Sequence, residues 1–412
     1  MRATWLLILA GATACSYSAV EAPPCAAGRT DVILQWNEQA VATGGPQLQR
    51  TLAMVHIAVF DAVNAVEPRY RPYLPLPAPP DDASIDAVAA GAAHGVLIRL
   101  SPDQRQPLAA ALARSLAAVP DGPAEAASVR YGDAVAQAIY DLRLGDRILL
   151  DDSAIPVGST PGAYQLTAEH EQPINTRARE WMPFVLASAS QFRPAGPPAI
   201  TSREYARDLA EVRDVGRLAR DRRSPDEEQI ARWHLEQGDV QLNRIARAAA
   251  AADGRDVLEH ARLFALLNVA IADANTGVFE AKYTYKFWRP VTAIRRADED
   301  GNHGTEPDVV WSPFLPTPPH PEYPSAHAAV HFAGARILTA YFGPSYAFEA
   351  TSRAVPGATR RYDNVEAFAK EGGESRILAG RHFRTSIDHG RMMGDRIAAW
   401  VLEHAFAPKT GR

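Results

Sequence analysis

Apolar residues recur every three to four positions along most of this chain, which is the spacing of amphipathic helices. Alternation with a period of two, rich in Val, Ile and Thr, is nearly absent from the sequence, and the pattern therefore predicts an all-α fold built from helical bundles. The predicted helices cover 47–66, 84–99, 106–118, 123–143 and, in the second half, about 203–221, 225–250 and 256–288.

The tract 153–200 interrupts this pattern with many Pro, Gly and Ser residues. We expect a long irregular connection there, since its prolines and aromatic residues are not typical of a flexible linker. The chain is accordingly divided into an N-terminal helical part (28–200) and a C-terminal helical part (201–412), packed together as one unit.

Residues 1–22 resemble an export signal. They contain one arginine, a short apolar run and small residues before Cys15. Cys15 is a candidate for lipidation, although Ala12 stands where such signals usually carry a larger aliphatic residue. A disordered or buried N-terminal helix is the alternative. The segment predicts export to the periplasm or the extracellular space, with a lipid anchor at Cys15 left open.

Composition narrows the class of protein further. The 412 residues are 47% hydrophobic and 22% charged, with a formal net charge of −5. This balance is typical of a soluble globular protein and argues against nucleic acid as a partner. After the N-terminus, the sequence has no apolar run approaching the roughly 18 residues that suggest an integral membrane span. The two cysteines, Cys15 and Cys25, provide neither a cysteine metal site nor a catalytic thiol.

Candidate chemistry is concentrated in three blocks, and the first is FEAKYTYKFWRP (279–290). Lys282 and Arg289 are two helical turns apart, so both can project from one helix face. Pro290 is expected to end that helix. A solvated basic face is the alternative, but the aromatic residues of the block suggest partly enclosed cations.

The second block is PSAHAAVH (324–331). Pro324 and Ser325 form a good helix start, and apolar residues then recur until a Gly-Pro pair at 343–344. Ser325, Ala326 and His327 would lie at a helix N-terminus, where free N–H groups favour anions. Structural packing of His327 is the alternative. His331 follows one turn later, but the missing Glu argues against a metalloprotease zinc motif.

The third block is SRILAGRHF (375–383). A helix containing Arg376 is expected to end near Gly380, and another to begin at 385–386. His382 would then lie at the break between two helices, where a side chain can face a cleft. The three blocks together supply three cations, a hydroxyl, a helix N-terminus and two histidines, with no carboxylate expected among them. This set suits a tetrahedral oxyanion, without which the enclosed cations would repel one another.

The spacings Lys-x6-Arg-Pro (282–290), Pro-Ser-x-His (324–327) and Ser-Arg-x5-His (375–382) resemble those of the vanadium-dependent haloperoxidases. This family shares a superfamily with type 2 phosphatidic acid phosphatases and bacterial acid phosphatases. The segments LAMVHIAVFDAVNAV (52–66) and ANTGVFEAKYTYKFWRPVTAI (274–294) are also similar to bacterial haloperoxidase-type proteins, so the resemblance covers most of the chain.

The resemblance implies a vanadate cofactor, with phosphate able to occupy the same site. It implies that His382 is the apical vanadium ligand, that His327 is the acid–base residue and that Lys282 also polarises bound peroxide. The implied equatorial oxyanion binders are Lys282, Arg289, Ser325, the backbone of Ala326 and Arg376. Two positions depart from the family pattern, because Ala326 replaces a glycine and Ser386 replaces an aspartate that would support His382.

The activity implied is oxidation of halide by hydrogen peroxide to hypohalous acid, with a small organic acceptor. Phe279 and His320 correspond to the halide pocket and favour bromide or iodide. The alternative enzyme is a soluble exported acid phosphatase, in which His382 would form a phosphohistidine and His327 would protonate the leaving alcohol. A non-catalytic oxyanion-binding protein is the third interpretation.

Overall fold

A computed structural model describes residues 31–45, 47–146, 158–220 and 223–409 of the chain. The expected export signal and Cys15 lie outside these residues. From Asp31 onward the chain forms one compact unit. The predicted boundary at residues 200 and 201 stays a prediction.

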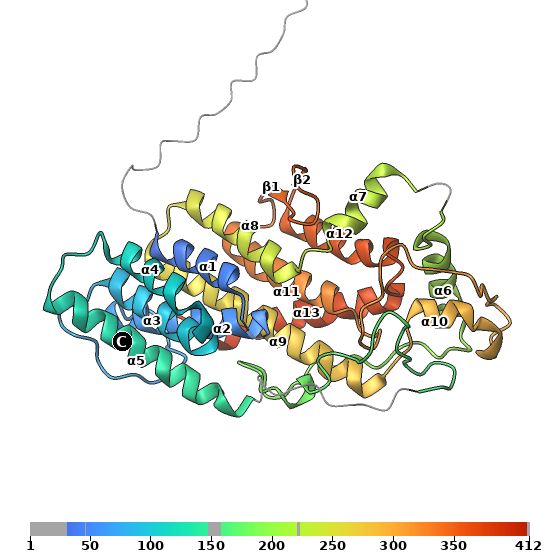
Figure 1. Ribbon diagram of the computed structural model, residues 1–412, viewed down its shortest axis with the longest axis horizontal. Coiled ribbons are helices and arrows are strands. Elements are labelled where there is room, and N and C mark those ends of the chain that lie inside the picture. The colour runs from blue at the N-terminus through green and yellow to red at the C-terminus, as the bar shows by residue number, and fades with distance from the viewer. Residues whose placement is uncertain (1–30, 46, 147–157, 221–222, 410–412) are drawn as a thin grey trace, which may run out of the picture. The chain divides into compact units, whose positions relative to one another are not determined.

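Helices dominate the first half of this unit, as the apolar pattern predicted (Figure 1). Asp31 caps the first helix by accepting hydrogen bonds from two backbone N–H groups, and Ser84 caps the third in the same way. The helices are α1 (Val32–Thr43), α2 (Leu48–Val66), α3 (Ile85–Leu100), α4 (Arg105–Leu116) and α5 (Pro123–Arg143), with short 3-10 turns η1 (Pro102–Gln104), η2 (Leu144–Asp146) and η3 (Ala178–Glu180).

The second half carries eight further α-helices and one hairpin among the described residues. The helices are α6 (Arg203–Val215), α7 (Pro225–Trp233), α8 (Gly238–Asp253), α9 (Val257–Tyr285), α10 (Pro290–Arg295), α11 (Ala326–Phe342), α12 (Val365–Leu378) and α13 (Arg384–His404), with the turn η4 (Ala297–Glu299). Strands β1 (Phe348–Thr351) and β2 (Thr359–Tyr362) pair antiparallel, with Phe348 opposite Tyr362. The sequence pattern did not predict this hairpin.

Three predicted helices differ from the observed ones. The helix predicted over 203–221 ends at Val215. The segment predicted as one helix over 225–250 is divided into α7 and α8. The helix predicted over 256–288 ends at Tyr285, because Lys286 adopts a left-handed backbone conformation. Pro290 therefore does not end a helix but begins α10, and Arg289 is its N-cap. Lys282 and Arg289 lie on different elements, which corrects the prediction that they share one helix face.

Helix α9 passes between the blue and teal helices of the first half and the orange and red helices of the second (Figure 1). It packs against α2, α11 and α13. By length and composition it is the one described helix that could cross a membrane, but its apolar window is entirely buried inside the protein. Such burial is the behaviour of a core helix. The main core joins residues from both halves, including Leu52 of α2 and Val330 of α11.

A second, smaller core lies beneath the three candidate blocks. Its aromatic members Phe287, Trp288, Tyr323 and Phe383 are buried and come from three different segments. Tyr205 of α6 contacts three of these rings. This packing fixes the loops that carry the chemistry, since each ring is a near neighbour in sequence of a candidate site residue.

Candidate active site

A cavity of about 560 Å³ opens at the N-terminus of α11. Its walls come from helices α2, α8, α9, α11 and α12 and from the loops around His320 and His382. Six of the predicted site residues line it: Phe279, His320, Ala326, His327, Arg376 and His382. The structure thus brings together residues that are more than one hundred positions apart.

The start of α11 forms one wall of the cavity. The Ser325 hydroxyl accepts a hydrogen bond from the Ala328 N–H at 3.3 Å, so Ser325 is the N-cap as predicted. Ala326 is the first helical residue and lines the cavity. Its right-handed helical backbone does not require glycine, so the methyl group is compatible with an anion site. The first-turn N–H groups of a helix lack partners four residues back and favour negative charge here.

His382 is held in one tautomer. Its Nδ1 lies 2.7 Å from Oε1 of Glu322, and its Nε2 lies 3.2 Å from a guanidinium nitrogen of Arg289. A guanidinium only donates, so Nε2 is the acceptor and Nδ1 carries the proton that Glu322 accepts. Burial, followed by the charges of Arg289 and Lys282, holds the pKa of His382 well below its usual value. The ring is therefore neutral and has a lone pair on Nε2.

Glu322 supplies the support for His382 that the replacement of aspartate by Ser386 left open. Its Oε1 also accepts the Phe383 N–H at 3.0 Å, whereas the Ser386 hydroxyl lies 3.4 Å from the His382 Nδ1. Burial raises the pKa of Glu322 to about 7. We had expected no carboxylate among the three blocks, and that expectation was wrong. Nothing local in the sequence identified Glu322, since its partner is 60 residues away.

Asp239 is a second carboxyl group that the sequence did not indicate. It is buried at the first turn of α8 and lines the same cavity as His327. Its Oδ2 has no hydrogen-bond partner among the described residues, and burial raises its pKa to about 6. Asp239 therefore adds a titratable group to the wall.

Lys282, Arg289 and Ser325 are fully buried but do not line the cavity. The Lys282 ammonium donates to the backbone carbonyls of Pro321 and Glu322, at 2.9 and 2.7 Å. Burial, and then the charge of Arg289, lowers the pKa of Lys282 well below its usual value. Lys282 and Arg289 thus lie behind the loops that form the cavity wall.

Two guanidinium groups do line the cavity. Arg376 is predicted by its motif, and it donates to the His234 carbonyl at 2.7 Å and to the Ser375 hydroxyl at 3.0 Å. Arg381 was not predicted, although it directly precedes His382 in the third block. Burial, with the charge of Arg289, lowers the pKa of Arg381 to about 10, so it remains a cation at neutral pH.

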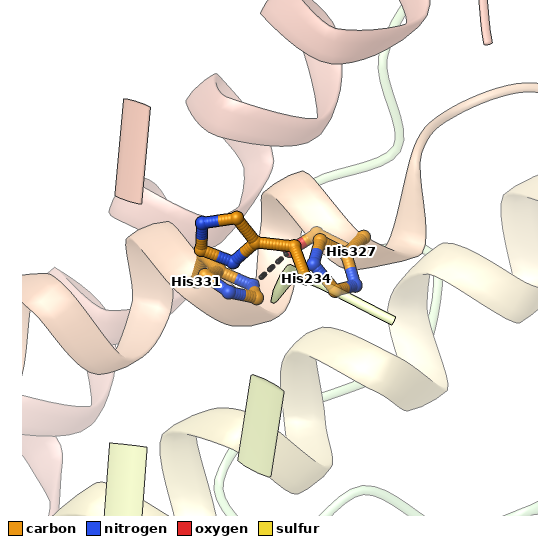
Figure 2. A group of neighbouring side chains, drawn as sticks. All are labelled: His234, His327 and His331. Carbon is orange, nitrogen blue, oxygen red and sulfur yellow. Dashed lines mark hydrogen bonds between the residues drawn. The ribbon is translucent and has the colours of Figure 1, made fainter. Parts of the chain in front are cut away.

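His327 projects from the first turn of α11 and lines the cavity. Burial, and then the charge of Arg376, holds its pKa well below the usual value. The neutral ring can accept a proton, which is the property that an acid–base residue needs for a first proton transfer. Its neighbours on the inner side are His331 and His234 (Figure 2).

Phe279 and His320 also line the cavity, with ring centroids 5.1 Å apart. Arg289 donates to the His320 Nδ1 at 3.0 Å and to the His320 carbonyl at 2.9 Å. Burial and this guanidinium lower the pKa of His320 well below its usual value. The structure thus places the two residues of the predicted halide pocket side by side, and the imidazole of His320 is neutral.

These groups together define a class of protein, namely an all-helical protein with a cationic pocket for a tetrahedral oxyanion. Two guanidinium groups and a helix N-terminus face the cavity, and the His382 lone pair offers a nitrogen ligand. The donor set fits vanadate or phosphate, both of which have this shape and charge.

The chain is similar in sequence and in fold to vanadium-dependent haloperoxidases. Residues 262–410 match the family model described as the VCPO second helical-bundle domain. Vanadium chloroperoxidase of Curvularia inaequalis is 26% identical, over 76% of this chain and 66% of that protein, so the chain spans a little less than two thirds of that relative.

Solved structures give the same result for the fold. The crystal structure of the first bacterial vanadium-dependent iodoperoxidase has a TM-score of 0.79 and 26% identity to this chain, and the match covers 92% of this chain and 97% of that one. The holo form of a bacterial vanadium-dependent chloroperoxidase has a TM-score of 0.71 and 18% identity, and covers 92% and 96%. The second likeness supports the architecture alone.

Proposed function

We propose that this protein is a vanadate-dependent haloperoxidase that oxidises halide with hydrogen peroxide to hypohalous acid. The observation that carries the proposal is the state of His382. Glu322 accepts its Nδ1 proton, so the lone pair is on Nε2, which accepts from Arg289 and would bind a cofactor once that hydrogen bond is released. A neutral, oriented imidazole is the ligand that an oxyanion cofactor needs.

The residues of the cavity have separate roles in this proposal. His382 would bind the cofactor through Nε2, and Arg376, Arg381 and the first-turn N–H groups of α11 would hold it in the pocket. Lys282 and Arg289 add positive charge from behind the wall. Vanadate, when bound, supplies a Lewis acid that activates hydrogen peroxide without a change in its oxidation state.

Proton transfer is assigned to His327. Because its ring is neutral, it can take a proton from incoming hydrogen peroxide and return one when hypohalous acid leaves. Lys282 does not line the cavity, but from behind the wall its charge would polarise a bound oxyanion and so favour attack by halide. The cavity is large enough to admit a small organic acceptor as well.

Bromide or iodide is the proposed halide. The neutral imidazole of His320 packed against the Phe279 ring forms a soft, polarisable surface that suits a large halide better than chloride. The similarity to a bacterial iodoperoxidase also supports this assignment.

We further propose that the protein is exported, on the basis of residues 1–22. Export with or without a lipid anchor at Cys15 is consistent with this proposal.

Purified apo-protein incubated with orthovanadate, hydrogen peroxide and bromide or iodide tests the proposal, with phosphate as competitor. Halogenation of an acceptor dye that requires vanadate and is suppressed by phosphate supports it. Hydrolysis of phosphate esters without halogenation would identify a phosphatase instead. Faster turnover with chloride than with either larger halide would overturn the halide assignment alone.

A further inference from the structure

Three histidines converge on the inner side of the cavity wall (Figure 2). His234 is the C-cap of α7, and His327 and His331 come from successive turns of α11. One ring nitrogen of each lies within 4.8 Å of those of the other two. His234 and His331 are fully buried, and His327 is the member that also reaches the cavity.

Hydrogen bonds fix the proton positions of two of these rings. His331 Nδ1 lies 2.8 Å from the His327 carbonyl oxygen, which can only accept, so the proton of His331 is on Nδ1 and the lone pair is on Nε2. His234 Nε2 lies 3.2 Å from a carboxylate oxygen of Glu371, so its lone pair is on Nδ1.

The free nitrogen of each ring is buried. His234 Nδ1, His327 Nε2 and His331 Nε2 are buried and have no hydrogen-bond partner among residues 31–409 that the structure describes. A buried ring nitrogen without a hydrogen-bond partner is energetically costly. Three such nitrogens, on rings that each bring a nitrogen within 4.8 Å of the other two, indicate that a further group belongs there.

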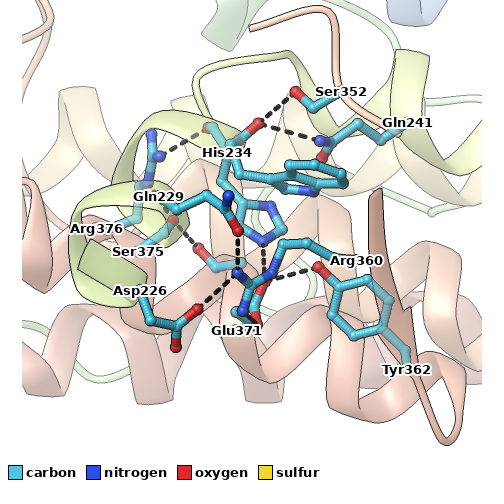
Figure 3. Close-up of polar contacts among 12 residues, drawn as sticks. Asp226, Gln229, His234, Gln241, Ser352, Arg360, Tyr362, Glu371, Ser375 and Arg376 are labelled. Carbon is cyan, nitrogen blue, oxygen red and sulfur yellow. Dashed lines mark hydrogen bonds and ion pairs between the residues drawn. The ribbon is translucent and has the colours of Figure 1, made fainter. Parts of the chain in front are cut away.

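Packing holds the rings in this arrangement. A Cβ atom at Gly238 would lie 2.5 Å from Cε1 of His331, and one at Gly372 would lie 2.5 Å from its Cδ2. The His331 ring therefore fits between two glycines, and it also stacks on Phe368. Glu371 is itself fixed by Arg360 and Tyr362, so the partner of His234 cannot easily turn away (Figure 3).

We propose that His234, His327 and His331 form a binding site for a divalent transition-metal cation of the zinc class. Neutral imidazole is a preferred ligand for such cations, and three histidines with one open position form a common zinc site. Donation of the second ring nitrogen to a carboxylate or a carbonyl, as seen for His234 and His331, is the usual arrangement around metal-binding histidines. Zinc–nitrogen bonds of about 2.0–2.1 Å require the rings to move slightly closer.

Charge acts in both directions at this site. Arg376, bound to the His234 carbonyl, opposes a dication, while Glu371 attracts one through His234. The site differs from the metalloprotease motif in two ways. The Glu that the motif needs after its first histidine is missing. The third ligand, His234, is the C-cap of α7 and not a residue of α11.

Metal at this site would bind the ring that we assign to proton transfer. The cation would therefore inhibit halide oxidation reversibly, a consequence that rests on the proposed function. Metal binding itself does not rest on it, because it is measured without turnover.

The test is titration of untagged, chelator-treated protein with Zn²⁺ by calorimetry. We expect one site in the wild type and at least about tenfold weaker binding in His331→Phe and in His234→Asn, since each loses one ligand. His303→Ala removes an exposed histidine outside the site and is the matched control, with unchanged binding expected.

A wild type that does not bind Zn²⁺, or variants that bind it as tightly as the wild type, would overturn the proposal and leave an ordered water as the occupant. A measurement that needs no variant covers the case of poor folding. Co²⁺ added to the wild type should give the intense visible absorption of a four-coordinate site, and the pale spectrum of the hydrated ion would count against it.

Discussion

Replacement of Glu322 by glutamine tests the link between this carboxylate and the cofactor ligand. Gln has the same shape, and its carbonyl oxygen can still accept the His382 Nδ1 and Phe383 N–H groups. It lacks the negative charge. A hydrogen bond to a charged group contributes about 1.5–3 kcal/mol and a neutral one about 0.5–1.5, so the difference is about 1–1.5 kcal/mol. Both side chains are buried, so solvent screens this difference little.

This energy predicts orthovanadate binding about tenfold weaker in Glu322→Gln than in the wild type. Glu322→Ala should lose more, up to about 100-fold, because the His382 Nδ1 proton then has no acceptor. The affinity is measured by calorimetry, and the Nδ1 proton of His382 by NMR. Glu280→Gln is the control, since Glu280 is a similarly buried carboxylate that pairs with Arg193 away from the cavity.

The effect of Glu322→Gln should also depend on pH. Because burial raises the pKa of Glu322 to about 7, the wild type loses the charge as the pH falls through that value. The proton can reside on Oε2, which has no partner among the described residues. At a pH of about 5.5 the wild type should therefore bind orthovanadate as weakly as the glutamine variant does. At a pH of about 8.5 it should bind orthovanadate about tenfold more tightly than that variant. Equal affinities across this range, or an equal loss in Glu280→Gln, would refute the reasoning.

Three further variants separate the roles of the cavity residues. His327→Ala should lower turnover by about 10² to 10⁴ while orthovanadate still binds in calorimetry, and a loss of binding instead would contradict its acid–base role. Ala326→Gly should lower stability by up to about 1 kcal/mol, seen as a lower Tm, with affinity within about twofold, because the helical N–H is kept; a large gain in affinity would show that the methyl group obstructs the site. Ser386→Asp places a second carboxylate beside Glu322 and should weaken orthovanadate binding, whereas tighter binding would mean that Glu322 does not already occupy this role.

The sequence predicted the helices whose signals are local. Helix α11 begins at a Pro-Ser pair and ends at a Gly-Pro pair, and its bounds agree with the prediction. The break between α7 and α8 was missed, because the four residues from His234 to Gln237 contain neither Gly nor Pro. The end of α9 was misplaced for a similar reason, since Lys286 adopts a left-handed conformation that is rare outside glycine and asparagine.

The site residues also divide into those with a local sequence signal and those without one. Arg376, His327 and His382 belong to short motifs, and the structure places all three around one cavity. Glu322 acts through a partner 60 residues away, and Asp239 meets the other cavity residues only through the packing of α8, so no local pattern could identify them. His234 was missed because its ring approaches His327 and His331 of α11 only in the folded chain. Spacing within a block is thus visible in the sequence, while the support between blocks depends on the packing of helices.

The most direct test is the halogenation rate of apo-protein as orthovanadate is added, measured in parallel for the wild type and His382→Ala. The wild type should have almost no activity without orthovanadate and should reach a plateau as one equivalent binds, while His382→Ala should stay near the background rate at every concentration. Activity in the wild type that does not depend on orthovanadate, or a His382→Ala variant that reaches the same plateau with the same affinity, would contradict the account.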